Sequence, residues 1–86
     1  MKSFCIIGLG RFGKTLAKTL AEEGAQVMVI DEDPEAVAEI ADLVTSAVIG
    51  DPTNEAVLRT SGVKNYDCAV VTLSEGNRYP QDDRTL

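Results

Sequence analysis

Short apolar runs alternate along the chain with segments in which apolar residues recur at helical spacing. The runs cover residues 2–7, 26–30, 47–49 and 68–73, and each is followed at once by a glycine or a polar residue. Continuous runs of this length are typical of strands buried on both faces of a parallel sheet. We therefore predict four strands at these positions.

Each interval between two runs predicts a helix. The first helix starts at Arg11 and ends before Gly24, because glycine often follows the last turn of a helix. Its expected buried stripe is Phe12, Leu16, Ala17 and Leu20. Asp33 and Pro34 predict the start of the second helix, as N-cap and first helical residue. The expected buried side of this helix is Val37, Ile40, Ala41 and Val44.

The third helix is expected over residues 52–61, ended by Gly62. The resulting order βαβαβαβ predicts an α/β fold with a parallel, Rossmann-type sheet in the strand order 3-2-1-4. We assign residues 1–76 to this domain and residues 77–86 to a polar C-terminal tail. A full dinucleotide-binding domain continues with further strands, so we expect the chain to be truncated relative to one.

A glycine-rich turn follows the first predicted strand and opens the first helix. Its sequence is Gly8-Leu9-Gly10-Arg11-Phe12-Gly13, which has the spacing G-x-G-x-x-G. Gly8 permits a tight turn, Gly10 lets a pyrophosphate approach the backbone, and Gly13 lets the helix pack closely on the sheet. The N–H groups at the start of the helix would bind the phosphates. The turn therefore predicts an adenine nucleotide site.

Asp31 ends the second strand, 18 positions after the last glycine of the motif, where an acid binds the hydroxyls of the adenosine ribose. Glu32 and Asp33 follow it, so a 2′-phosphate would meet a cluster of carboxylates. This favours NAD(H) or ADP/ATP over NADP. Asp33 is expected to act only as a helix cap.

Further candidates for the site lie at other strand ends. Arg11 is the one cation expected near the phosphates. Gly50 and Asp51 follow the third strand, where Asp51 contacts the ligand or caps the helix that begins at residue 52. Thr72 and Leu73 end the fourth strand, across the point where the strand order reverses.

Composition excludes several function classes. A net charge of −6 and a pI near 4.4 disfavour nucleic acid and anionic membrane surfaces as partners. The sequence has no histidine, so we expect neither histidine-based catalysis nor histidine-bound metal, and we assign no catalytic or metal-binding residue. Cys5 and Cys68 lie in apolar runs and are expected to be buried, reduced thiols of a cytosolic protein.

Several stretches together resemble the first half of the TrkA-N domain, also called KTN or the N-terminal domain of regulators of potassium conductance (RCK). They are residues 6–13 (IIGLGRFG), 29–31 (VID), 47–53 (AVIGDPT), 61–63 (SGV) and 66–71 (YDCAVV). The resemblance covers residues 1 to about 76. This combination is more specific than the glycine motif alone.

The resemblance implies a non-catalytic, cytoplasmic regulator that binds NAD(H) or ADP/ATP. Its partner would be a membrane potassium transporter or channel, which would hold it at the inner face of the membrane without lipid insertion. The family's binding roles carry over to Gly8, Gly10, Arg11, Phe12, Gly13, Asp31, Gly50 and Asp51. The alternative function is the nucleotide-binding half of an NAD-dependent oxidoreductase.

The fourth predicted strand leads us to expect a homo-oligomer, a dimer or higher. Residues 68–73 are apolar on both faces, and the polar tail offers little to cover them. An uncovered strand at a sheet edge tends to pair with another chain. Self-association through this edge is therefore expected.

Overall fold

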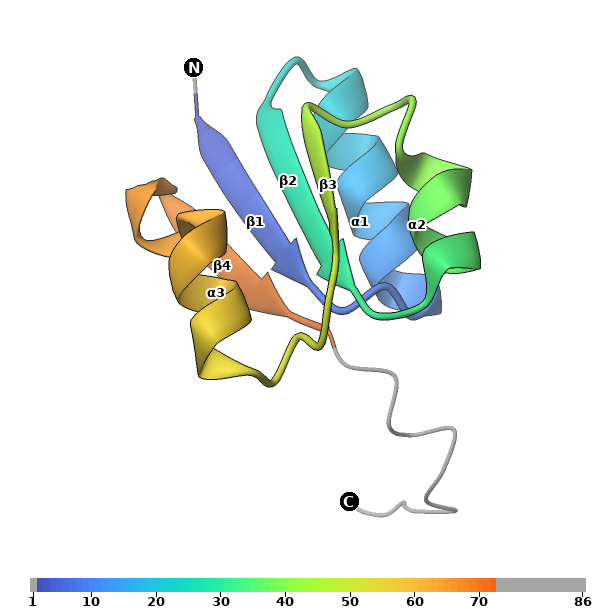
Figure 1. Ribbon diagram of the computed structural model, residues 1–86. Helices are drawn as coiled ribbons and strands as arrows, with labels where there is room; N and C mark the ends of the chain where they lie inside the picture. Colours follow the sequence, from blue (N-terminus) through green and yellow to red (C-terminus); the bar gives the residue numbers. More distant parts are fainter. Residues whose placement is uncertain (1, 73–86) are drawn as a thin grey trace, which may run out of the picture.

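The computed structural model describes residues 2–72, which form one sheet with helices on both of its faces (Figure 1). The elements in chain order are β1 (Ser3–Ile7), α1 (Arg11–Glu22), β2 (Gln26–Asp31), α2 (Pro34–Ile40), β3 (Ser46–Ile49), α3 (Glu55–Ser61), a 3₁₀ turn η1 (Val63–Asn65) and β4 (Cys68–Val71). Leu73 and the predicted polar tail lie outside the described residues.

The four strands form a parallel sheet in the order β3-β2-β1-β4, which confirms the predicted topology. β1 lies in the middle, with Phe4 opposite Val27 on one side and opposite Cys68 on the other. Because all strands run in the same direction, their carboxyl ends meet at one edge of the sheet. The turns that follow the strands are thereby brought together.

The side chains of the central strands divide between two cores. On one face, Ile6, Val27 and Val29 are fully buried and pack with residues of α1 and α2. On the other face, the side chains of Met28 and Ile30 pack in a cluster that includes residues of α3 and η1. Figure 1 shows the same arrangement, with α1 and α2 on one side of the sheet and α3 on the other. Burial on both faces explains the continuous apolar runs.

The buried stripe of α1 is confirmed in part. Ala17 is fully buried, and Leu16 and Leu20 pack against the same cluster. The prediction was wrong for Phe12, whose side chain is 66% exposed. Phe12 belongs to the glycine motif and lies in the first turn of α1, after the carboxyl end of β1.

The second helix is shorter than its apolar pattern indicated. It ends at Ile40, and Ala41, predicted to be buried, is exposed. Leu43 N donates to Ile40 O in a turn that leads back to β3. Val44 still packs against the core, but from this turn and not from a helix. The periodicity identified the apolar residues correctly and misplaced the helix end, because the chain needs these residues to return to the sheet.

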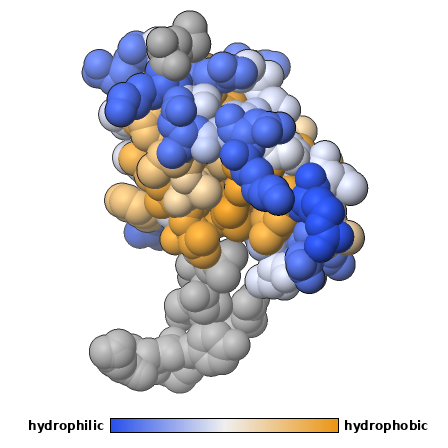
Figure 2. Space-filling view, turned by 90° about the vertical axis from the view of Figure 1, so that its left-hand side faces the viewer, coloured by the Kyte–Doolittle hydropathy of each residue, from blue (hydrophilic) through white to orange (hydrophobic). Residues whose placement is uncertain are grey.

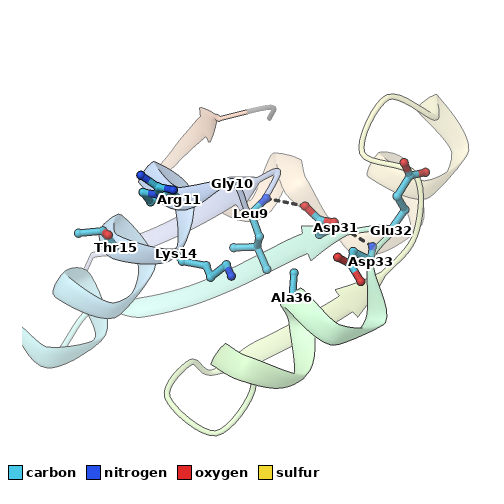
Figure 3. A pocket seen from close by; sticks show the side chains of 9 residues that line it. All are labelled: Leu9, Gly10, Arg11, Lys14, Thr15, Asp31, Glu32, Asp33 and Ala36. Carbon is cyan, nitrogen blue, oxygen red and sulfur yellow. Dashed lines mark hydrogen bonds between the residues drawn. The ribbon is translucent and has the colours of Figure 1, made fainter. Parts of the chain in front are cut away.

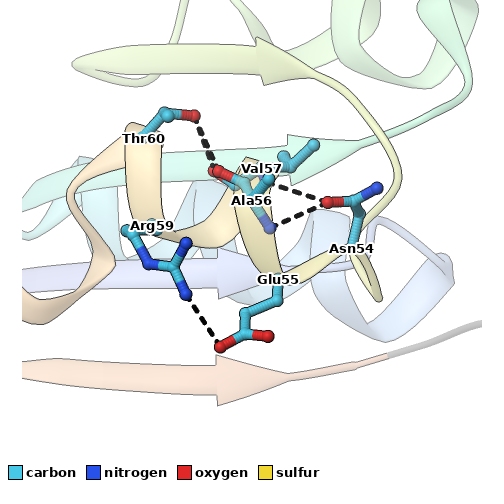
Figure 4. A network of polar contacts seen from close by, with 6 residues as sticks. All are labelled: Asn54, Glu55, Ala56, Val57, Arg59 and Thr60. Carbon is cyan, nitrogen blue, oxygen red and sulfur yellow. Dashed lines mark hydrogen bonds and ion pairs between the residues drawn. The ribbon is translucent and has the colours of Figure 1, made fainter.

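The third helix begins at Glu55, three residues later than predicted. Asn54 Oδ1 accepts hydrogen bonds from Ala56 N and Val57 N, at 2.8 and 3.2 Å, and so caps α3 (Figure 4). Asp51 therefore does not cap this helix. Its Oδ1 instead accepts from Thr53 N and Thr53 Oγ1, at 2.8 and 2.6 Å, in a turn before the helix.

The two cysteines lie in different environments. Cys5 is fully buried in β1, and burial raises the pKa of its thiol to about 11. Cys68 is exposed, so the prediction of two buried thiols was wrong for this residue. It starts β4, which among the described residues pairs with β1 alone.

Two glycines of the turn have structural reasons to be glycine. Gly8 has φ = 100°, in the left-handed region that residues with a Cβ rarely adopt. Gly13 is buried in α1, and a Cβ added there would overlap the Gly8 carbonyl oxygen and Thr72 Oγ1. The close approach of α1 to the sheet therefore depends on Gly13, as the sequence predicted.

We expect Gly13→Ala to lower the free energy of unfolding by about 1–3 kcal/mol, because the added methyl group forces α1 away from Gly8 and Thr72. Alanine is the better helix former by about 1 kcal/mol, so a loss of stability cannot come from helix propensity. Urea unfolding measures the change. Thr19→Ala, at an exposed position of the same helix, is the control and should change stability by about 0.5 kcal/mol or less. A Gly13→Ala chain as stable as the unmodified one would contradict the packing argument.

Candidate functional site

A pocket of about 580 Å³ opens at the carboxyl ends of the strands, between the glycine turn and the start of α2 (Figure 3). Its volume lies in the range of ordinary small-molecule sites. The lining residues come from the β1–α1 turn, the first turns of α1, the end of β2 and the start of α2. They are Leu9, Gly10, Arg11, Lys14, Thr15, Asp31, Glu32, Asp33 and Ala36.

Asp31 connects the end of β2 to the glycine turn. Its Oδ2 accepts a hydrogen bond from Leu9 N at 2.5 Å, and its Oδ1 accepts from Asp33 N at 2.9 Å (Figure 3). A carboxylate oxygen accepts more than one hydrogen bond, so both oxygens retain acceptor capacity. Asp31 therefore holds the turn in place and can still accept from a hydroxyl group in the pocket.

The start of α1 offers backbone donors to an anion. Gly10 is its N-cap, and no side chain of the described residues accepts a hydrogen bond from the N–H groups of the first turn. The first turn also has no acidic residue. Unpaired N–H groups and the helix dipole make such an N-terminus attractive for phosphate. Gly10 itself has φ = −70° and ψ = −171°, which other residues can adopt, so its backbone does not require glycine.

Two cations line the pocket, where the sequence predicted only Arg11. The second is Lys14, whose Nζ lies 2.6 Å from Glu39 Oε1 on α2. Figure 3 shows the Lys14 side chain extending toward α2, while Arg11 and Thr15 lie on the other side of α1. The sequence could have indicated that Lys14 and Thr15 line the pocket together with Arg11. Residues three and four positions after Arg11 lie one helical turn away from it.

Asp33 and Ala36, at the start of α2, also line the pocket without having been assigned to it. Asp33 Oδ1 accepts from Glu35 N at 3.0 Å, which confirms its predicted role as helix cap. It therefore both caps α2 and adds a carboxylate to the wall beside Asp31 and Glu32.

The remaining predicted residues lie near this pocket without lining it. Phe12 and Gly13 follow Arg11 in α1. Gly50 N donates to Asp31 O at 2.9 Å, which places the end of β3 beside the end of β2. Thr72 Oγ1 donates to Gly8 O at 2.5 Å, so the end of β4 lies against the glycine turn. Leu73, the last predicted site residue, is outside the described residues.

Asp51 is exposed, and its carboxylate is already engaged by Thr53. The two hydrogen bonds from Thr53 lower the pKa of Asp51 below its ordinary value. Of the two roles that the sequence left open, the helix cap is excluded. A ligand contact stays a prediction.

Over residues 2–72, no group of three or more His, Cys, Asp and Glu side chains is placed to hold a metal ion. Within the same residues, none of the helices combines the length and the apolar character needed to span a bilayer.

Comparison with known proteins identifies the family to which the chain belongs. Residues 4–79 match the TrkA-N domain family. Ktr system potassium uptake protein C of Bacillus subtilis (strain 168) is 47% identical over 74 residues, which are 86% of this chain and 34% of the relative. Ktr system potassium uptake protein A of the same organism is 38% identical over 72 residues, 84% of this chain and 32% of the relative.

A third relative comes from another organism. The Trk system potassium uptake protein TrkA homolog of Pyrococcus abyssi (strain GE5 / Orsay) is 40% identical over 63 residues, 72% of this chain and 28% of the relative. The chain spans about a third of the length of the curated relatives that it matches.

We expect Asp31→Ala to lower the free energy of unfolding by about 1–3 kcal/mol, because it removes two hydrogen bonds to a charged acceptor and leaves Leu9 N unpaired. Urea unfolding measures the change. Glu32→Ala removes the neighbouring, exposed carboxylate and should cost about 0.5 kcal/mol or less. Equal losses in both variants would show that Asp31 does not hold the turn.

Proposed function

The chain belongs to the TrkA-N domain family, and on that basis we propose that it is a nucleotide-binding regulatory domain of a potassium uptake system. The full-length relatives are named as Ktr and Trk potassium uptake proteins. The proposed partner is a membrane potassium transporter or channel subunit, which would hold the domain at the cytoplasmic face of the membrane.

The proposed ligand is an adenine nucleotide, either NAD(H) or ADP/ATP. The observation that carries this proposal is one pocket with uncapped backbone donors at the start of α1 and the Asp31 carboxylate at the end of β2. The donors suit phosphate oxygens, and the carboxylate suits the hydroxyls of the ribose. Gly8, Leu9 and Gly10 would follow the phosphates along the turn, and Gly50 and Thr72 would border the site.

The proposed mechanism is ligand-dependent gating without catalysis. A ligand changes an equilibrium between two conformations only as far as it binds them with different affinity. Here the pocket joins the start of α1 to the start of α2, so a ligand that contacts both helices would favour one arrangement of them. The alternative, half of an NAD-dependent oxidoreductase, has weaker support, because the relatives are named for potassium uptake.

Calorimetric titration with NADH, NADPH, ATP and ADP tests the proposal. A regulatory site of this kind should bind both NADH and the adenine nucleotides through their shared adenosine and phosphate groups. Binding that requires the nicotinamide ring would favour the oxidoreductase. Failure of all four compounds to bind would overturn the nucleotide site.

We predict that NADPH binds at least about tenfold more weakly than NADH, a difference of about 1.4 kcal/mol. The physical reason is repulsion between the 2′-phosphate and the carboxylates of Asp31, Glu32 and Asp33, which line the same wall. Asp31→Ala should narrow the difference. Equal affinities of the unmodified chain for the two cofactors would refute the prediction.

Gly10→Val should abolish nucleotide binding and leave the far-ultraviolet circular dichroism spectrum largely unchanged. Valine can adopt the extended backbone of Gly10, but its side chain would occupy the space that the pyrophosphate needs. Titration with NADH and ATP measures the loss. Normal affinity in this variant would place the phosphate site elsewhere in the molecule.

We also propose that the domain self-associates through β4. Val71 is 62% exposed, Cys68 and Ala69 are exposed, and among the described residues β4 pairs only with β1. Figure 2, which views the molecule from the side of β4, shows a broad apolar area there. Exposed strand edges and apolar patches of this kind favour association with another chain.

Light scattering should therefore give a mass near twice the 9.2 kDa of the chain, most simply from a twofold dimer. If β4 forms the contact, the exposed Cys68 thiol should react more slowly with a thiol reagent as the protein concentration rises. The Cys68→Ser variant is the labelling control. A monomer over a wide concentration range would refute the dimer.

A further inference from the structure

Lys14 is a pocket residue whose charge is already engaged. It lies in the first turns of α1, and its ammonium group bonds to the Glu39 carboxylate of α2. Glu39 does not line the pocket. The side chains of Lys14 and Glu39 are 36% and 62% exposed, so the pair lies at the surface between the two helices.

The pair differs from the other ion pair of the described residues. Arg59 and Glu55 are one turn apart on α3, so their contact joins no separate elements (Figure 4). Lys14 and Glu39 join α1 to α2, at the pocket in which three carboxylates and only two cations line the wall. A ligand with phosphate groups would attract the ammonium group of Lys14, whose charge Glu39 now neutralises.

We propose that Lys14 is a second phosphate-binding residue, and that Glu39 competes with the phosphate for its ammonium group. This inference rests on the proposed nucleotide-binding function and specifies how the affinity of that site is set. In the ligand-free chain Lys14 bonds to Glu39. When a nucleotide is bound, Lys14 bonds to its phosphate oxygens, and the polar link between α1 and α2 is broken.

The exchange is physically feasible for three reasons. Ion pairs as exposed as this one contribute little to stability, so breaking it costs little. The ammonium group lies at the end of a flexible four-carbon chain and can reorient without movement of the helix backbone. The free N–H groups at the start of α1 lie within about one helical turn of Lys14, and they would hold the phosphate on the same side of the pocket.

The exchange would also connect the ligand to the position of α2. β2 leads into α2 through Asp31, Glu32 and Asp33, so this helix already contributes to the ribose end of the site. Loss of the bond between Lys14 and Glu39 would remove a polar contact at the opposite end of α2 when phosphate binds, while Ile40 keeps this end packed in the core. Phosphate binding and the contact between α1 and α2 are then linked through one ammonium group.

The test is a double-mutant cycle on the whole chain, with ATP as the phosphate-bearing probe and adenosine as the probe without phosphate. Glu39→Gln should tighten ATP binding by about two- to fivefold, the range expected from releasing a surface ion pair. Lys14→Gln should weaken ATP binding by about threefold or more. The double variant should bind ATP as Lys14→Gln does, and adenosine affinity should be unchanged throughout.

Glu35→Gln is the matched control, because Glu35 lies on the same helix and forms no ion pair with Lys14. The substitution therefore removes one negative charge from α2 and leaves the bond between Lys14 and Glu39 intact. Unfolding midpoints of all variants verify that affinity changes do not come from partial unfolding. Three results would overturn the proposal. Glu35→Gln could raise the affinity for ATP as much as Glu39→Gln does, or Glu39→Gln could still raise that affinity when Lys14 is replaced. The third result is an unchanged affinity for ATP in Lys14→Gln.

These outcomes are distinct from failure of the proposed function. If the unmodified chain binds no nucleotide, the nucleotide site itself is refuted, and the role of Lys14 with it. In another outcome, the unmodified chain binds ATP, the Gly10→Val variant does not, and the double-mutant cycle shows no coupling between Lys14 and Glu39. Only the inference about Lys14 is then refuted.

Discussion

The structure depends on the burial of β1 and β2 on both faces of the sheet. Side chains on one face of these strands pack with α1 and α2, and those on the other face pack with α3 and η1. To supply helices for both faces, the chain must cross over after each strand, and parallel strands are the result. The carboxyl ends of all four strands therefore lie at one edge, where the pocket forms.

At this edge, the groups that fold the turn are also those best suited to a ligand. Asp31 accepts from Leu9 N, and Thr72 donates to the Gly8 carbonyl, so the ends of β2 and β4 both hold the glycine turn. Gly13 allows α1 to approach closely enough for its N-terminus to face the pocket. Substitutions here are expected to change both stability and the proposed ligand binding, whereas Gly10, with an unstrained backbone, offers a way to separate the two effects.

The pocket carries nearly as many positive as negative side chains, although the whole chain has a net charge of −6. Asp31, Glu32 and Asp33 follow one another from the end of β2 to the start of α2, whereas Arg11 and Lys14 belong to α1. This separation suits a ligand with a neutral, hydroxyl-bearing part and an anionic part, as in adenine nucleotides. Because Lys14 is shared with Glu39, the positive side of the pocket is linked to α2.

The sequence alone determined the fold class, the strand order and the positions of the glycine turn and Asp31, because continuous apolar runs and the G-x-G-x-x-G spacing are local signals of buried strands and of a tight turn. It also identified Asp33 as a helix cap. It misplaced the start of α3 at residue 52, because Asp51 is a good cap by type, and only the structure shows that Asp51 forms a turn with Thr53 while Asn54 caps the helix.

Only the tertiary structure decided which residues are exposed and which charges meet. Phe12 and Cys68 were both predicted to be buried from the apolar pattern, yet both are exposed, because Phe12 lies in the first turn of α1, after the end of β1, and Cys68 lies on an edge strand. The contact between Lys14 and Glu39 joins residues on different helices. Helical periodicity describes each helix by itself, and the packing of α1 beside α2 is what brings these two charges together.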